Sequence, residues 1–248
     1  MCYHYSLGQP QEAISKVLSA EWEMPFEPIY HISGFAFAPM PVITQQEPHK
    51  VQAYQWGLIP HWVKTTAEAQ KLKAQTLNAK AETLFEKPAF RTYVMHNRCL
   101  VLSDGFFEWM EYKKKKYPHF VHLKNNELFA FAGLYSHWTD KETGELLHTF
   151  TIITTDANPL MARIHNTKQR MPVILPKEQW QHWLEPSLNK EQIESMLFPC
   201  DDKGMKAYSI SKLITTRGAE TNVPQIKEPY QYSELASTEE GTLFDTLG

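Results

Sequence analysis

Short apolar runs, alternating or continuous, dominate the middle of the chain. They are bounded by residues that favour turns, and they cover 51–58, 99–102, 106–112, 117–123, 128–134, 148–154 and 171–175. Runs of this length and period are typical of β-strands. The polar stretches 113–116 and 140–144 separate neighbouring runs and predict hairpin loops. The pattern therefore predicts an antiparallel sheet that curls on itself.

Helical patterns are fewer. The segments that carry them are 11–18, 79–85, 159–164, 177–184 and 190–197. Asn78 directly precedes one of them and is interpreted as an N-cap, because its side chain can accept hydrogen bonds from the first free amides of a helix. Together these elements predict an α+β fold, with a mostly antiparallel β-sheet curled into a barrel-like core and peripheral helices.

One domain is expected over residues 1–226. The 248-residue chain is 42% hydrophobic and 21% charged, which is typical of a globular protein with a proper core. The pattern of elements is lost only after about Lys227, so 227–248 is expected to be a loosely held C-terminal tail.

Neither a membrane protein nor a secreted one is expected. No apolar run approaches the ~20 residues that cross a bilayer, and the N-terminus lacks the basic and apolar regions of a secretory signal. Cys2, Cys99 and Cys200 have no CxxC spacing and cannot form a disulfide framework. A reducing, cytoplasmic setting follows.

Charge and motif content exclude several function classes. The net charge is −3, whereas proteins that bind long duplexes through many phosphates are usually basic, so any nucleic-acid site must be a local patch. The lysine run 113–116 is interpreted as a solvated turn. Histidines and cysteines lack metal-ligand spacing, and no glycine-rich phosphate-binding motif occurs, so neither a metal nor a cofactor is expected.

Cys2 is the first candidate for chemistry. Removal of Met1 would leave a cysteine with a free α-amine. An α-amine has a pKa of ~7.7–8.0, so part of it is neutral and nucleophilic near neutral pH. It condenses with an aldehyde to an imine, and the neighbouring thiol can then close a five-membered thiazolidine ring.

Two further residues could move protons. Glu108 lies in a strand-like run among aromatic residues, and alternation places it on the same face as Phe106. This environment favours a pocket carboxyl with a raised pKa, although most strand glutamates are paired on a solvent face. His165 lies between a predicted helix and a predicted strand, where site residues are often held. Taken alone, such a histidine is more often a surface or core residue.

The order of these motifs carries more information than each motif alone. The motifs are Met1 with Cys2, 56–60 with Trp62, 77–83, 103–109, 164–166 and 170–175. In this order they resemble the SRAP family (SOS response-associated peptidase), whose members shield abasic sites in single-stranded DNA. The similarity runs from Cys2 to about Pro224, nearly the whole chain.

The resemblance implies four catalytic roles. Cys2 would be the nucleophile, exposed by autocatalytic removal of Met1, and Asn78 would hold the Cys2 end in place. Glu108 would be the acid/base that moves protons during imine formation, ring opening and ring closure. His165 would assist at the opened sugar.

The resemblance also implies a set of DNA contacts. Lys80 and Arg170 would bind phosphates, and Thr154 would belong to the same DNA-binding set. Pro39 and Trp62 would pack against bases or sugars beside the lesion. Stacking and a few phosphate contacts suit single-stranded DNA and need no large basic surface.

The activity implied is DNA repair within the SOS DNA damage response. The N-terminal aminothiol would capture the aldehyde of an abasic site as a covalent thiazolidine DNA–protein crosslink. The enzyme classes implied are an autocatalytic cysteine peptidase, which is a hydrolase, and a crosslinking activity of lyase type. The expected partner is single-stranded DNA with abasic sites. We expect a monomer in the cytoplasm, on the nucleoid when DNA is bound.

The chain departs from the family pattern in three places. Tyr3 and His4 stand where the family commonly has glycine and arginine, so a histidine replaces one cation beside the nucleophile. Lys80 stands for an arginine, which trades a bidentate fork for a point charge. Residues 167–169 look like an insertion that could shift His165.

Two other functions fit parts of the pattern. One is an N-terminal-nucleophile amidase or peptidase that acts in trans and turns over peptides or amides. The other is a DNA-binding module that recognises junctions without bonding to them, whose binding would survive Cys2→Ala and vanish in high salt.

Overall fold

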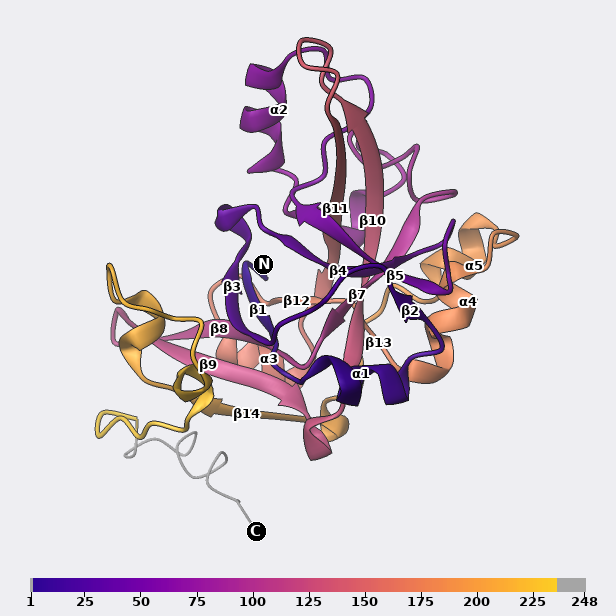
Figure 1. The fold of residues 1–248 in the computed structure, drawn as a ribbon. Helices are drawn as coiled ribbons and strands as arrows, with labels where there is room; N and C mark the ends of the chain where they lie inside the picture. The colour runs from indigo at the N-terminus through magenta and orange to yellow at the C-terminus, as the bar shows by residue number, and fades with distance from the viewer. Residues whose placement is uncertain (1, 236–248) are drawn as a thin grey trace.

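Five strands close into a barrel at the centre of the computed structural model, which describes residues 2–235 (Figure 1). Their order is β5 (Lys50–Trp56), β4 (Pro39–Thr44), β7 (Arg98–Ser103), β10 (Phe129–Thr139) and β11 (Leu146–Asp156). β11 then pairs in parallel with β5 and closes the ring. Short strands extend it: β2 (Glu21–Trp22), β6 (Asn78–Lys80), β12 (Arg170–Pro172) and β13 (Ile174–Leu175). The expected α+β class and curled, mostly antiparallel core are confirmed.

A second sheet packs against the barrel and carries the start of the chain. Its strands, all antiparallel, are β14 (Met205–Ser209), β9 (Lys115–Leu123), β8 (Gly105–Tyr112), β1 (His4–Leu7) and β3 (Ile29–Ser33), in that order. Buried Tyr5 and Phe106 pack with Phe131 of the barrel. Because β1 is an inner strand, neighbours on both sides fix the position of the N-terminal segment.

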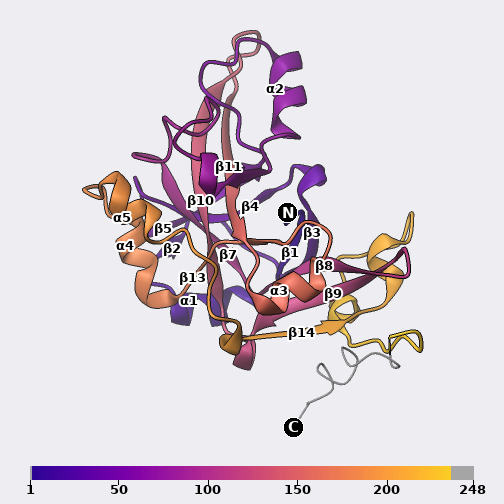
Figure 2. The ribbon, with the colours of Figure 1, turned by 180° about the vertical axis from the view of Figure 1, so that it is seen from behind.

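The helices are short and lie at the periphery. They are α1 (Gln11–Val17), α2 (Thr66–Lys73), α3 (Pro159–Ile164), α4 (Trp180–Leu184) and α5 (Lys190–Glu194), with 3-10 turns at Gly34–Ala36, Ala81–Thr83, Lys124–Asn126, Lys177–Gln179, Asp202–Gly204, Lys212–Thr215 and Pro224–Lys227. α2 stands beside the β10–β11 hairpin, and α3 lies beside β8 (Figure 2). Within residues 2–235 no helix is long and apolar enough to span a membrane.

The helix expected over 79–85 is wrong. Asn78–Lys80 is strand β6, which pairs in parallel with β11, and only a single 3-10 turn follows it. Asn78 is therefore a strand residue and not an N-cap. Pairing with β11 satisfies the backbone groups of these residues in place of a helix, and no local feature of the sequence indicates that this strand lies beside them.

Most other predicted elements are confirmed with shifted ends. Both hairpin loops are present, and Lys113 and Lys114 adopt positive φ of 48° and 61° in the β8–β9 turn. The remaining predicted helices are present as α1, α3, α5 and the 3-10 turn that runs into α4. The predicted strand at 171–175 is divided into β12 and β13. β1, β3, β4, β14 and α2 were not predicted.

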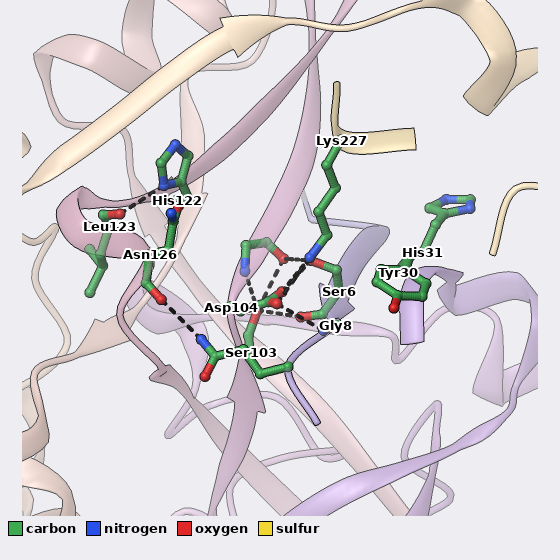
Figure 3. Close-up of polar contacts among 12 residues, drawn as sticks. Ser6, Gly8, Tyr30, His31, Ser103, Asp104, His122, Leu123, Asn126 and Lys227 are labelled. Atoms are coloured by element: carbon green, nitrogen blue, oxygen red, sulfur yellow. Dashed lines mark hydrogen bonds and ion pairs between the residues drawn. The ribbon is translucent and has the colours of Figure 1, made fainter. Parts of the chain in front are cut away.

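Lys227 ties the end of the described chain to β1 (Figure 3). Its Nζ lies 2.8 Å and 3.0 Å from the two carboxylate oxygens of Asp104. Asp104 also accepts hydrogen bonds from Ser6 Oγ at 2.6 Å and Gly8 N at 2.8 Å. A Cβ at Gly8 would lie 2.9 Å from both Lys227 Nζ and Tyr30 Cδ1, so a larger residue would have to displace the end of the lysine side chain and the Tyr30 ring.

The loosely held tail expected over 227–248 is described only as far as residue 235. In that part Tyr232 and Leu235 are buried, and the Tyr232 hydroxyl donates to the carbonyl of Ile210 at 2.8 Å. The remainder of that expected tail, 236–248, lies outside the described residues.

Arg98 holds one end of the barrel to the helical layer. Its side chain is fully buried and donates to four carbonyls, those of Val94, Met95, Trp183 and Glu185. Burial lowers the pKa of this guanidinium to about 10. The positive charge is therefore stabilised by hydrogen bonds to backbone carbonyls of two chain segments, 94–95 and 183–185, and not by a hydrogen bond to a carboxylate.

Candidate active site

Cys2 lies directly before β1, in the apolar layer between the two sheets. Its side chain is fully buried, and the Asn78 amide nitrogen donates to the Cys2 carbonyl at 2.9 Å. Burial first, and then the charge of Glu108, raises the pKa of the Cys2 thiol. The thiol is therefore protonated near neutral pH, and a base is needed before it can attack.

Glu108 faces the same apolar layer from the middle of β8. Only 4% of its surface is exposed, and burial raises its pKa to about 7. Phe106, two residues earlier on the same face, belongs to the apolar cluster that includes Cys2. The pocket environment expected from strand alternation is confirmed, and a carboxyl with this pKa exchanges protons readily near neutrality.

His165 closes α3 and lies next to Glu108. Its Nδ1–H donates to the carbonyl of Arg170 at 2.7 Å, which leaves Nε2 directed at Glu108 Oε2, 3.9 Å away. Burial lowers the pKa of His165 to about 4, so the imidazole is neutral at physiological pH. The segment 167–169, expected to endanger this placement, leaves His165 beside Glu108.

Glu108 and His165 line one pocket with a volume of about 400 Å³. The other lining residues come from the start of the chain, the β8–β9 hairpin, the turn after α3 and the 3-10 turn Lys212–Thr215. In that order they are Tyr3 and His4; Trp109, Glu111 and Lys116; Thr167 and Lys168; and Thr215. The four residues with implied catalytic roles are thus brought together, two at the buried Cys2 end and two in the pocket.

His4 differs from the cation that the family pattern places there. Its Nδ1 lies 2.9 Å from His31 Nε2, and His31 Nδ1 lies 2.8 Å from Thr221 Oγ1. Burial lowers the pKa of both histidines to about 4, so neither carries a charge at neutral pH. His31 and Thr221 were not predicted, because only the pairing of β1 with β3 and the return of the C-terminal segment place them here.

Three of the five residues with implied DNA contacts lie together. β6 pairs with β11 at Lys80 and Thr154, and Arg170 bonds to the Thr154 carbonyl, whereas Pro39 comes from β4 and Trp62 from the segment after β5. Pro39, Trp62 and Lys80 are exposed, Trp62 by 48%. Thr154 is fully buried, and its hydroxyl donates to the carbonyl of Ala79 at 3.5 Å. None of these residues lines the pocket, and their roles stay predictions.

Arg170, also in that set, already makes several hydrogen bonds within the protein. Its guanidinium bonds to Asp156 Oδ1 at 2.9 Å, to Glu82 Oε2 at 3.0 Å and to the Thr154 carbonyl at 2.8 Å. A phosphate contact by Arg170 would therefore have to compete with two carboxylates. Within residues 2–235 no group of three or more His, Cys, Asp or Glu side chains could hold a metal ion.

Known proteins are similar to this chain both in sequence and in fold. The sequence model of the SOS response associated peptidase (SRAP) family matches residues 1–217. Abasic site processing protein YoqW of Bacillus subtilis (strain 168) is 37% identical over 236 residues, which cover 93% of this chain and 100% of YoqW. Abasic site processing protein HMCES of Gallus gallus is 32% identical over 150 residues, 52% of this chain and 44% of that protein.

A crystal structure of a protein from Bacteroides thetaiotaomicron superposes with a TM-score of 0.87. The two chains are 38% identical, and the match covers 93% of this chain and 100% of that one. The family model, YoqW and the solved structure each match most of the length of this chain. The chain therefore belongs to the SRAP family.

Proposed function

We propose that this protein processes abasic sites in DNA by forming a covalent thiazolidine crosslink through Cys2. One observation carries the proposal: the buried Cys2 end, held by Asn78, is electrostatically coupled to a carboxyl with a pKa of about 7. The names of the relatives, abasic site processing proteins, support the choice of DNA lesion. The proposed working form is a monomer on single-stranded DNA.

The reaction begins at the α-amine of Cys2, once Met1 has been removed. The amine adds to the aldehyde carbon of the opened abasic sugar, forming a C–N bond and a carbinolamine. Protonated Glu108 gives its proton to the departing hydroxyl group, which leaves as water, so that a protonated imine and an ionised Glu108 result. The neutral fraction of Glu108 required for this step is substantial because its pKa is about 7.

Ring closure uses the same carboxyl in the opposite direction. Ionised Glu108 takes the proton of the Cys2 thiol, and the sulfur attacks the carbon of the protonated imine, whose N–H becomes the N–H of the ring. The product is a thiazolidine with one new C–S bond, and one water molecule is lost overall. Closing the ring removes the imine, which would otherwise allow β-elimination and strand breakage.

Neutral His165 assists at the sugar. Its Nε2 is directed into the pocket beside Glu108, where it can accept a hydrogen bond from a hydroxyl of the opened ribose. The bond from Nδ1 to the Arg170 carbonyl fixes the ring orientation. His165 thereby holds the reacting carbon near both the amine and Glu108.

Release of Met1 is the peptidase part of the proposal. We propose that it is autocatalytic, with Cys2 as the nucleophile and Glu108 as the proton acceptor. Intact-mass measurement of purified wild type and Cys2→Ala tests this step. Wild type should lack Met1, and a variant that loses Met1 equally well would assign the cleavage to another enzyme.

The decisive experiment is a denaturing gel. Single-stranded DNA with one uracil, treated with uracil-DNA glycosylase, should give a slow-migrating adduct with wild type and none with Cys2→Ala. Asn78→Ala should form the adduct more slowly, because the Cys2 carbonyl loses its donor. An adduct that persists undiminished in Cys2→Ala would refute the proposal, and turnover of peptides beyond one equivalent would favour an amidase acting in trans.

A further inference from the structure

The turn after α3 is held rigidly on both sides. The Asn166 side chain bonds both backbone groups of Glu111 in β8: Glu111 N donates to Asn166 Oδ1 at 3.0 Å, and Asn166 Nδ2 donates to the Glu111 carbonyl at 2.8 Å. At the other end, Gln169 N donates to the His165 carbonyl at 2.8 Å, and Ala157 N donates to the Gln169 carbonyl at 3.0 Å. Residues 166–169 thus form a supported turn between β8 and β11.

This turn presents two polar side chains to the pocket. Thr167 and Lys168, at its apex, both line the pocket with Glu108 and His165. The positive charge of Lys168 is one of the influences that lower the pKa values of Glu108 and His165. The lysine is therefore close enough to act on whatever group occupies the space beside these two residues.

Lys168 and Lys116 are the two lysines that line the pocket, and both are exposed. Lys168 lies on the turn that follows His165, and its charge acts on both Glu108 and His165, whereas Lys116 comes from β9. None of the ion pairs found within residues 2–235 involves Lys168. Arg170 is engaged by Glu82 and Asp156, and His4 is neutral in its contact with His31. A DNA strand that brings its sugar to Glu108 also brings a phosphodiester group on each side, and each needs a counter-charge.

We propose that the 166–169 turn is a phosphate-binding element, in which Lys168 Nζ and Thr167 Oγ1 bind the phosphodiester next to the abasic nucleotide. The inference rests on the proposed function and adds to it a contact that replaces the charge missing at His4. A lysine suits this place because its point charge on a flexible stem can follow a single-stranded backbone. Asn166 is a positioning residue that fixes the turn and does not touch DNA.

The test separates binding from bond formation. Affinity is measured by fluorescence anisotropy with a single-stranded oligonucleotide that carries one tetrahydrofuran residue, a stable abasic analogue that cannot form an imine. One phosphate contact contributes about 0.7 to the slope of log affinity against log salt for single strands. Lys168→Met should make this negative slope less steep by about 0.7. The ratio of wild-type affinity to Lys168→Met affinity should therefore fall about 2.6-fold between ~50 and ~200 mM salt.

Companion variants separate charge from shape. Lys168→Arg should keep the wild-type slope, whereas Lys168→Glu should make the slope even less steep than Lys168→Met does. Lys16→Met, which removes an equally exposed lysine from α1, is the matched control and should leave the slope unchanged. Asn166→Ala should weaken affinity by loosening the turn, although it changes no charge.

Crosslinking provides the second readout. With glycosylase-treated DNA, Lys168→Met should need more DNA than wild type for its half-maximal rate, whereas Lys168→Arg should need about the same amount as wild type. An unchanged salt slope in a folded Lys168→Met protein would overturn the phosphate-binding element while leaving the proposed function intact. Absence of an adduct with wild type would instead refute the proposed function. In that case, a difference in salt slope between wild type and Lys168→Met would still support the phosphate contact.

Discussion

Glu108 and His165 respond to the same burial in opposite senses. Burial disfavours the charged form of each group, so the carboxyl pKa rises to about 7 and the imidazole pKa falls to about 4. Both groups are consequently neutral over part of the physiological range, and only Glu108 changes charge near pH 7. We therefore predict that Glu108 carries out the proton transfers of the proposed reaction.

Replacing Glu108 with glutamine tests this assignment. Glu108→Gln should slow adduct formation about 10²–10⁴-fold, since a general acid/base contributes that much, and should weaken affinity for tetrahydrofuran DNA far less. In wild type, ring closure should accelerate as pH rises through 7, because ionised Glu108 accepts the thiol proton. Equal losses of rate and affinity would indicate a structural role.

The same variant has a second, opposite effect on stability. The folded-state pKa of Glu108, about 7, lies above its ordinary value of 4.5, so the folded protein holds this proton more tightly than the unfolded chain. This contribution is complete below pH 4.5 and is lost as pH rises to 7. The melting temperature of Glu108→Gln should therefore rise relative to that of wild type as pH increases from 4.5 to 7. If the two melting temperatures changed with pH in parallel, the raised pKa of Glu108 would be contradicted.

At the scale of single elements, Arg98 is predicted to matter more than its lack of a catalytic role suggests. Arg98→Met would leave four carbonyls without this donor, two of them in buried hydrogen bonds and two in partly buried ones, which should destabilise the fold by about 3 kcal/mol or more. Urea unfolding measures this loss. Arg91→Met, on the exposed turn nearby, is the control and should lie within about 0.5 kcal/mol of wild type.

The sequence predicted elements where local pattern and tertiary environment agree. β5, β7, β8, β9, β10 and β11 have the apolar alternation of strands that are buried on at least one face. β6 failed because Asn78–Lys80 is extended by pairing with β11, a partner more than seventy residues away that local propensity does not report. β1 and β3 were missed because their polar residues, among them His4 and His31, hydrogen-bond to each other across the strands.

The site itself was predicted in part. Glu108 followed from strand alternation, and Cys2, Asn78 and His165 followed from the resemblance to a family. Thr221 could not be predicted, because it reaches His31 only through the return of the C-terminal segment. The charge state of His4 could not be predicted either, since it depends on burial and on a neighbouring histidine.

At the scale of the molecule, the ion pair between Lys227 and Asp104 links the C-terminal segment to the junction of β7 and β8, where Asp104 also holds Ser6 and Gly8 of the N-terminal segment. Lys227→Met would leave the Asp104 carboxylate buried with neutral donors only, at a cost of roughly 3–5 kcal/mol for a buried pair that is broken on one side. Asp104→Asn combined with Lys227→Met should lose less than the two single variants together.

Hydrogen exchange localises this effect. The amides of Tyr30 and His31 donate to Asn222 Oδ1 in the C-terminal segment, so they should exchange faster in Lys227→Met. Amides in the barrel strand β10 provide the internal control. Faster exchange in β10 to the same extent would mean that the variant opens the whole fold and not this segment alone.

The inner position of β1 has a consequence for how the protein is made. β1 pairs with β8 at Gly105 and Phe106, and its carboxylate anchor Asp104 is completed by Lys227. A growing chain exposes its N-terminus first, and the partners that position Cys2 follow over a long stretch of chain: β3, then Asn78, then β8, with Lys227 only near the end. The Cys2 end is therefore synthesised well before its surroundings are complete, so a nascent or truncated chain carries Cys2 without all of the contacts that position it.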